Sequence, residues 1–140
     1  MKKFLFYLLS FTWGLPMTLV GCVVSFVLLS LGYKPKKYGY CWYFEVGNHW
    51  GGLELGVCFL TDTTPSEHTK KHEHGHAIQN CYFGPLMPFI VSIPSAIRYW
   101  YRELKYCRKG QTPPTEYDDA WFEGDASRRG TKFIESLGEK

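Results

Sequence analysis

The sequence predicts an α+β fold in which membrane-embedded helices accompany a β-hairpin and a pair of polar helices that carry a candidate site. Three observations support this prediction: residues 4–33 carry no charge, residues 40–60 hold two aromatic and β-branched segments, and two capped polar helices follow. The chain has 140 residues, which allows one modest hydrophobic core. We divide it into a membrane helical segment at 1–33 and a folded domain at 34–140.

The uncharged run is the first candidate for a membrane segment. It is longer than the ~20 residues that one span needs and too short for two full spans. Lysines precede and close it, and Gly14 and Pro16 divide it, so we expect a short helix near residues 4–13 and a longer one near 17–32. A cleaved signal peptide is the alternative, although the run is long for one and no small-x-small cleavage site stands clear of it.

Two strands are expected before the next helix. Residues 40–46 are aromatic and β-branched, and residues 53–60 form a second such segment that Gly56 interrupts. Turn residues at 47–48 and 51–52 separate the two segments, which predicts a β-hairpin. This hairpin could offer an edge strand to an extended polypeptide, or it could only cover the following helix.

The most informative motif lies at residues 72–76, which read His-Glu-His-Gly-His. On a helix, His72 and His76 share one face and can offer two imidazole nitrogens to one metal ion, while Glu73 lies close enough to accept a proton from a water ligand. A capping-box pattern at 64–67 and the Gly-Pro pair after residue 83 predict a helix over 65–83. The alternative is a solvated helix that is rich in histidine by accident.

A catalytic zinc site usually takes a third protein ligand, and the best candidate lies downstream. A second capping-box-like start at 115–118 predicts a helix over 116–129 that Gly130 ends. Glu123 lies in the middle of this helix among aromatic residues, where a carboxylate would be held against the core. Asp119, one turn earlier on the same face, is the second choice.

The order of these motifs resembles a known family. It is similar to that of small bacterial membrane proteins with a gluzincin-type zinc site, in which a His-Glu-x-Gly-His motif is followed by Gln79, Gly-Pro-Leu at 84–86, Ile-Pro-Ser at 93–95 and Glu-Gly-Asp-Ala at 123–126. The resemblance covers about residues 64–133. It implies a zincin-like pair of site-bearing helices, with the two motif histidines and Glu123 as zinc ligands and Glu73 as the general base.

Two positions depart from the family pattern. His74 stands where relatives tend to have an aromatic residue, and Ser127 stands where many gluzincins have an aspartate that hydrogen-bonds a ligand histidine. The remaining polar residues of the two helices have less certain roles. His68 could donate a hydrogen bond or act as an alternative ligand, although a solvated histidine is expected there, and His74 is expected at the surface. Gln79 could orient a backbone group or lie on the helix surface.

The expected activity is zinc-dependent hydrolysis of peptide bonds. Zinc would polarise the scissile carbonyl and activate water, Glu73 would take the water proton, and Tyr117 is a candidate oxyanion donor that could equally be a core aromatic. The substrate would be a peptide or protein. A non-catalytic membrane protein with a structural metal, and a metal-free scaffold at the membrane interface, are the alternatives. His49, in the predicted hairpin turn, is expected to be a loop residue.

A shared site constrains the topology of residues 84–101. If residues 86–97 crossed the bilayer, His72 and Glu123 would lie on opposite sides of it. Either the segment re-enters without crossing, or the number of earlier crossings differs, or Glu123 is not a ligand. We expect a re-entrant or broken helix that packs on the amino-terminal helices, because its three prolines interrupt helical hydrogen bonding. The apolar segments predict a multi-helix integral protein. The lysines and arginines that flank these segments are expected on the cytoplasmic side, which predicts a metal site near the cytoplasmic interface.

Composition excludes several other classes. A net charge of +3 with no basic face or nucleic-acid module argues against a nucleic-acid partner, whereas an aromatic content of 18% fits a partner that is a lipid bilayer. The five cysteines are scattered and form no Cys-x-x-Cys pair, so neither a zinc ribbon nor a redox motif is indicated and reduced thiols are expected.

Overall fold

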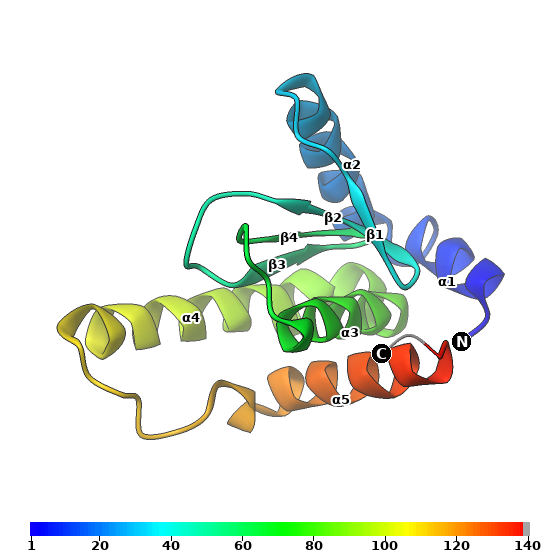
Figure 1. The fold of residues 1–140 in the computed structure, drawn as a ribbon. Coiled ribbons are helices and arrows are strands. Elements are labelled where there is room, and N and C mark those ends of the chain that lie inside the picture. The colour runs from blue at the N-terminus through cyan, green and yellow to red at the C-terminus, as the bar shows by residue number, and fades with distance from the viewer. Residues whose placement is uncertain (139–140) are drawn as a thin grey trace.

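The computed structural model describes residues 1–138, and within them the fold is α+β, with five α-helices and a four-stranded mixed sheet (Figure 1). The helices are α1 (Lys3–Ser10), α2 (Leu15–Ser30), α3 (Glu67–Phe83), α4 (Ile93–Lys105) and α5 (Trp121–Ser136). The strands are β1 (Lys36–Tyr38), β2 (Cys41–Glu45), β3 (Gly52–Leu55) and β4 (Cys58–Thr61). Shorter helical turns are η1 (Gly84–Leu86), η2 (Pro88–Ser92), η3 (Cys107–Lys109) and η4 (Tyr117–Asp119). The sheet covers one side of α3, and α5 lies along the other.

The sheet differs from the predicted hairpin. Its strand order is β1-β2-β4-β3, and β2 pairs with β4 in parallel, so the two predicted strands are not hairpin partners. The second predicted strand instead folds back on itself at Gly56, where Leu55 pairs with Cys58. Gly56 has a φ of 74°, and a Cβ there would lie 2.4 Å from the Thr18 hydroxyl oxygen of α2. This tight turn makes β3 an edge strand.

Both site-bearing helices form, but their ends differ from the predictions. α3 is capped by Ser66, whose hydroxyl accepts a hydrogen bond from the Thr69 amide at 3.0 Å, so the helix begins two residues later than predicted. α5 begins only at Trp121, because η4 forms a separate turn that Glu116 and Asp119 cap reciprocally. α5 then continues through Gly130, where the sequence predicted its end.

The amino-terminal helices break where the sequence predicted. α1 and α2 meet at an angle of 90°, between Ser10 and Leu15. Residues from both predicted domains contribute to each of two apolar clusters. Phe6 of α1 packs with Phe59 and Ile134, and Met17 of α2 packs in the second cluster, with Leu55, Met87 and Val91.

The second apolar segment is broken as expected. After α3 the chain passes through η1 and the π-helical turn η2 before α4, and the two halves of this path are bent by 115°. Met87 and Val91 of this segment pack near Met17, which confirms the predicted contact with the amino-terminal helices. No single helix within residues 1–138 is long and apolar enough to cross a membrane, whereas two bent helix pairs meet both criteria together: Lys3–Ser10 with Leu15–Ser30, and Glu67–Leu86 with Pro88–Lys109.

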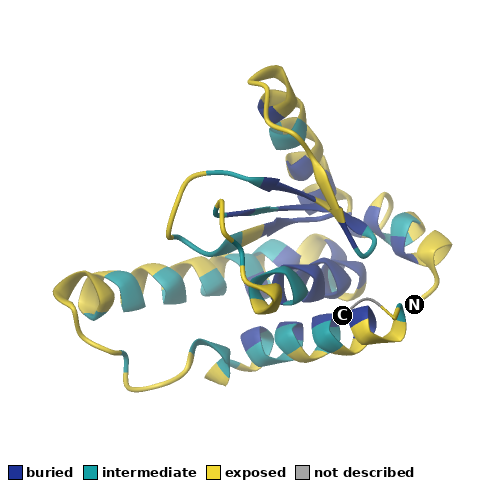
Figure 2. Cartoon of the chain, viewed as in Figure 1, coloured by how far each residue is buried: buried dark blue, intermediate teal, exposed yellow. Residues whose placement is uncertain are grey.

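Burial is uneven across the helices (Figure 2). The middle of α3 is enclosed, whereas α4 contains no buried residue. Much of α2 is exposed despite its apolar sequence, as shown by Val23 at 58% and Phe26 at 73% exposure.

Candidate metal centre

Two glycines allow α3 and α5 to approach closely. A Cβ on Gly75 would lie 1.8 Å from the backbone oxygen of Ala126, and a Cβ on Gly130 would lie 1.7 Å from the backbone oxygen of Lys71. A side chain at either position would force the helices apart. The predicted role of Gly130 as a helix end is therefore wrong, because this residue lies inside α5 and permits the contact. The contact places Glu123 opposite the motif histidines.

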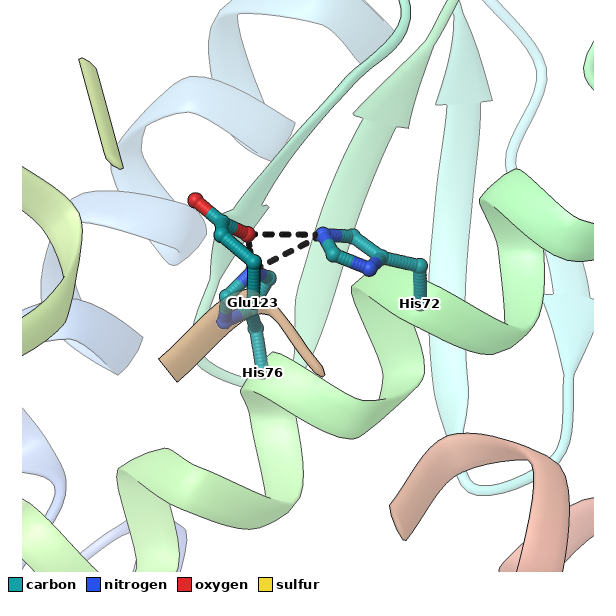
Figure 3. A group of neighbouring side chains, drawn as sticks. All are labelled: His72, His76 and Glu123. Atoms are coloured by element: carbon teal, nitrogen blue, oxygen red, sulfur yellow. Dashed lines mark hydrogen bonds and ion pairs between the residues drawn. The ribbon is translucent and has the colours of Figure 1, made fainter. Parts of the chain in front are cut away.

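The three predicted ligands converge (Figure 3). The Nε2 atoms of His72 and His76 lie 3.0 Å apart, and Glu123 Oε2 lies 3.0 Å from the first and 3.1 Å from the second. All three side chains are buried. Glu123 lies in the first turn of α5 rather than in mid-helix as predicted, because the helix starts late.

The separation of the donor atoms suits one metal ion. Donors bound tetrahedrally at about 2.0–2.1 Å lie roughly 3.3 Å from one another. The observed separations of 3.0–3.1 Å require only a small adjustment to meet this value. His72, His76 and Glu123 are the residues that could hold a divalent cation.

Gln79 fixes which ring nitrogen of His76 carries the proton in the neutral imidazole. The Gln79 amide nitrogen lies 2.9 Å from two acceptors, the backbone oxygen of Phe122 and Asp125 Oδ2, so it must donate to both. Gln79 Oε1 then faces His76 Nδ1 at 2.8 Å and accepts its proton. In a neutral imidazole this arrangement leaves the lone pair on Nε2, directed at Glu123. Gln79 is fully buried rather than on the helix surface, and its hydrogen bonds orient both the ligand histidine and the backbone of Phe122.

His72 is oriented through Ser127 and Asp118. The Ser127 hydroxyl donates to Asp118 Oδ2 at 2.7 Å and therefore accepts from His72 Nδ1, also at 2.7 Å. A carboxylate thus acts on the ligand histidine through one hydroxyl, although residue 127 is not the aspartate found in many gluzincins. The lone pair of a neutral His72 therefore also lies on Nε2 and points into the cluster.

The cluster can therefore hold a cation at its centre. Two imidazole lone pairs and one carboxylate oxygen face one another, and Glu123 Oε1 has no hydrogen-bond partner in the described chain. Without a metal, a proton supplies the positive charge. Burial lowers the pKa of His76, but the hydrogen bond to Glu123 and nearby carboxylates outweigh burial and raise it to about 9. Burial acts to raise the pKa of Glu123, but its hydrogen bonds with both histidines hold it well below its usual range.

Glu73, the predicted base, is buried beside the edge strand β3. A Cβ on Gly52 would lie 2.5 Å from Glu73 Oε1, so the carboxylate rests against the bare backbone of this glycine. Burial raises the pKa of Glu73, assisted by the Glu123 charge and opposed by the motif histidines. The sequence did not predict Gly52 as a site residue, because only the packing of β3 against α3 places it beside Glu73.

A further carboxyl group lies nearby on β3. Glu54 is buried and accepts a hydrogen bond from the Gly56 amide. Burial raises its pKa to about 8, against the opposing influence of His76, so this side chain is mainly neutral at pH 7. Its position could not be inferred from the predicted hairpin, whose pairing was wrong.

Tyr117 reaches the site, whereas Asp119 does not. The Tyr117 hydroxyl lies 3.1 Å from the Ser95 hydroxyl of α4, and its ring centroid lies 6.2 Å from that of His72. Burial and the Glu123 charge raise the pKa of Tyr117 well above its usual value, so the hydroxyl remains a proton donor. Asp119 caps the Glu116 amide, so the second choice of ligand is wrong.

The other histidines take separate roles. His68 is 65% exposed, and its Nε2 lies 3.3 Å from Asp118 Oδ2, which places it outside the metal cluster. His74 was expected at the surface but is fully buried; its Nε2 accepts from the Tyr40 amide at 3.1 Å, and its ring stacks on Phe133. Residues 72–81 of α3 are all buried, so no face of the helix at His74 reaches the surface, and the surface prediction is wrong. His49 is a loop residue with a φ of 57°, as predicted.

A pocket of about 610 Å³ opens onto the cluster. It is lined by His72, Glu73 and His76 of α3, by residues 50–54 around β3, and by side chains of η2 and α4. The volume falls in the usual range for ligand sites. The arrangement can bind a cation, hold a general base beside it and admit a ligand along an edge strand.

Comparison with known proteins provides no independent assignment. No family model, no curated protein and no solved structure matches the chain. The chemistry of the site must therefore be argued from its own residues.

Proposed function

We propose that this protein is a membrane-associated zinc metallopeptidase. The observation that carries the proposal is the buried convergence of two imidazole nitrogens and one carboxylate oxygen, with both lone pairs aimed inward by Gln79 and Ser127. Two histidines and a glutamate form a donor set of catalytic zinc sites, which leave one position open for water or substrate.

The residues around the donors fit the chemical steps of hydrolysis. Zinc bound here would polarise a scissile carbonyl and lower the pKa of a water ligand to about 7. Glu73 would accept a proton from the attacking water and return it to the leaving amine, and its raised pKa brings it closer to the working range of a general base. The protonated hydroxyl of Tyr117 would donate to the developing oxyanion.

The edge strand offers a way to hold the substrate. The Asp62 amide donates to the Gly51 oxygen at 3.1 Å, which makes these two residues a hydrogen-bonded pair of the antiparallel ladder. By alternation, the amide and carbonyl groups of Gly52 and Glu54 are directed away from β4. Both residues line the pocket. An extended peptide could therefore add to β3 by main-chain hydrogen bonds beside Glu73.

The main alternative is a non-catalytic membrane protein with a structural metal. Structural zinc sites are usually closed by four protein ligands. Within residues 1–138 only three candidate ligands converge, and the pocket reaches them. These features favour a catalytic role over the structural one, and they also favour metal binding over a metal-free scaffold.

Membrane association is supported by the exposed apolar surface. Leu19, Val23 and Phe26 of α2 and Ile97 of α4 are all more than half exposed. Lysines follow α2, and lysines and arginines lie within and after α4. We propose that these surfaces lie in a lipid bilayer with the metal site near its cytoplasmic interface.

Zinc analysis and a matched pair of variants test the proposal. Full-length protein purified in detergent should contain one zinc per chain and should hydrolyse unstructured polypeptides. Glu73→Gln should keep the zinc and lose roughly 10²–10⁴-fold in rate. Glu135→Gln, at an exposed position on α5, is the control and should retain full activity. Failure to bind zinc, or full hydrolysis by Glu73→Gln, would contradict the proposal.

A further inference from the structure

The pocket has two chemically different walls. The α3 wall carries the metal cluster and Glu73, and β3 runs beside it. The facing wall comes from Met87, from η2 and from α4, and its side chains are mostly apolar: Met87, Val91, Ala96, Tyr99 and Trp100. Trp50 and Leu53 extend this apolar lining at the rim near β3.

The apolar wall is fixed to the rest of the fold. Met87 and Val91 are each 1% exposed and pack in the cluster that contains Met17 of α2. On the other side, Arg98 donates to the backbone oxygens of Glu116 and Tyr117, at 2.8 and 3.1 Å. These contacts anchor the wall to α2 and to the segment that precedes α5, so its position relative to the metal cluster is defined.

The two serine hydroxyls of this wall are already engaged. The Ser95 hydroxyl lies 3.1 Å from the Tyr117 hydroxyl, and the Ser92 hydroxyl donates to the Met87 oxygen at 3.5 Å. A charged substrate side chain placed here would lose its water and gain no partner of opposite charge. An apolar side chain would lose only contact with water, which is favourable.

We infer that the site selects polypeptides in which a bulky apolar side chain, such as that of leucine, methionine or phenylalanine, flanks the scissile bond. The inference rests on the proposed peptidase function and adds its substrate class. A peptide laid along β3 directs successive side chains to opposite faces, so a residue beside the scissile bond can enter the space between β3 and α4. Burial of that side chain favours it roughly 10- to 100-fold over a small or charged one.

Cleavage of a defined peptide mixture tests the selectivity. Zinc-loaded full-length protein should cut beside large apolar residues, as mapped by mass spectrometry. Ala96 is exposed and lines the pocket, so the larger side chain of Ala96→Phe should occupy part of the pocket. This variant should reduce cleavage beside phenylalanine and leucine by roughly tenfold, compared with cleavage beside alanine in the same peptide mixture. Ile97→Phe is the matched control, since this neighbour is 65% exposed and lies outside the pocket lining; it should leave the preference unchanged. Cleavage without apolar preference, or an unchanged preference in Ala96→Phe, would overturn the inference.

A binding measurement separates this inference from the proposed function. Glu73→Gln should bind a labelled peptide that contains phenylalanine roughly 10- to 100-fold more tightly than the same peptide with aspartate there. Selective binding without hydrolysis by the unmodified protein would defeat the peptidase proposal and keep the apolar selectivity. Equal binding of the two peptides would overturn the selectivity, whether or not hydrolysis occurs.

Discussion

Helices α3 and α4 follow one another in the chain, yet their burial is the reverse of what their composition suggests. α3 contains histidine, glutamate, glutamine and asparagine, and all ten residues from 72 to 81 are buried. α4 carries Ile93, Ile97 and Leu104 along one stripe, and these side chains are 49–65% exposed. The polar helix is inside the molecule and the apolar stripe is outside it.

The difference shows what each helix is built to contact. A polar helix can be buried only when its polar atoms find partners, and the two motif histidines meet Glu123, Gln79 and Ser127. A contiguous exposed apolar stripe is typical of a surface that another molecule covers. The apolar stripe of α4 is consistent with a lipid surface, and its inner face forms the wall of the pocket.

The largest expected effect comes from breaking the contact that encloses α3. Gly75→Ala places a methyl group 1.8 Å from the Ala126 backbone oxygen, and the neighbour cannot yield because it is backbone. We expect a loss of about 3 kcal/mol in the free energy of unfolding and a loss of metal binding. Thermal unfolding in detergent measures the first effect. Arg128→Ala, whose side chain is 75% exposed, is the control and should change stability by less than about 0.5 kcal/mol.

A smaller and more selective effect is expected at Gly52. In Gly52→Ala the new Cβ meets the flexible end of Glu73, which can move aside. The fold and the zinc site should therefore survive while hydrolysis falls by roughly 10- to 100-fold, since a base displaced by about 1 Å loses its geometry. Parallel measurements of zinc content and of kcat test this prediction. Equal loss of zinc and activity would show that Gly52 supports the fold and not the position of Glu73.

Exchange of the His76 proton for a metal ion should make both stability and apparent metal affinity depend moderately on pH. The pKa of His76 is raised to about 9 in the zinc-free fold, so its contribution to stability is present in full below about pH 6.5 and is lost as the pH rises through about 9. Zinc must displace this proton, so apparent zinc affinity should rise by up to about tenfold per pH unit between pH 6.5 and 8.5. Competition with a chelator at each pH measures the slope. A flat profile would contradict proton release from the cluster.

The smallest effect on folding is expected on the exposed stripe of α4. Ile97→Lys removes an apolar side chain that is 65% exposed and should change the free energy of unfolding by less than about 0.5 kcal/mol. The transfer of the Ile97→Lys variant from detergent micelles into lipid vesicles should nevertheless fall if the stripe contacts lipid. Ile78→Lys on α3, at a residue only 6% exposed, should instead prevent folding. A large loss of stability in Ile97→Lys would remove the contrast between the two helices.

The sequence by itself determined the local elements and the ligand types. Helical spacing placed His72 and His76 on one face, and the division of the amino-terminal run at Gly14 and Pro16 followed from the chemistry of proline. Glu123 was selected because its apolar neighbours predicted a carboxylate held against the core. These inferences depend on interactions within a few residues, and periodicity encodes them directly.

Only the tertiary structure decided the pairings between distant segments. The parallel pairing of β2 with β4, the burial of His74, and the passage of α5 through Gly130 depend on contacts across the fold. A glycine that ends a helix and a glycine that permits close helix packing are the same letter in the sequence. The backbone of the facing helix distinguishes them, and that helix also brings Glu123 to the two histidines.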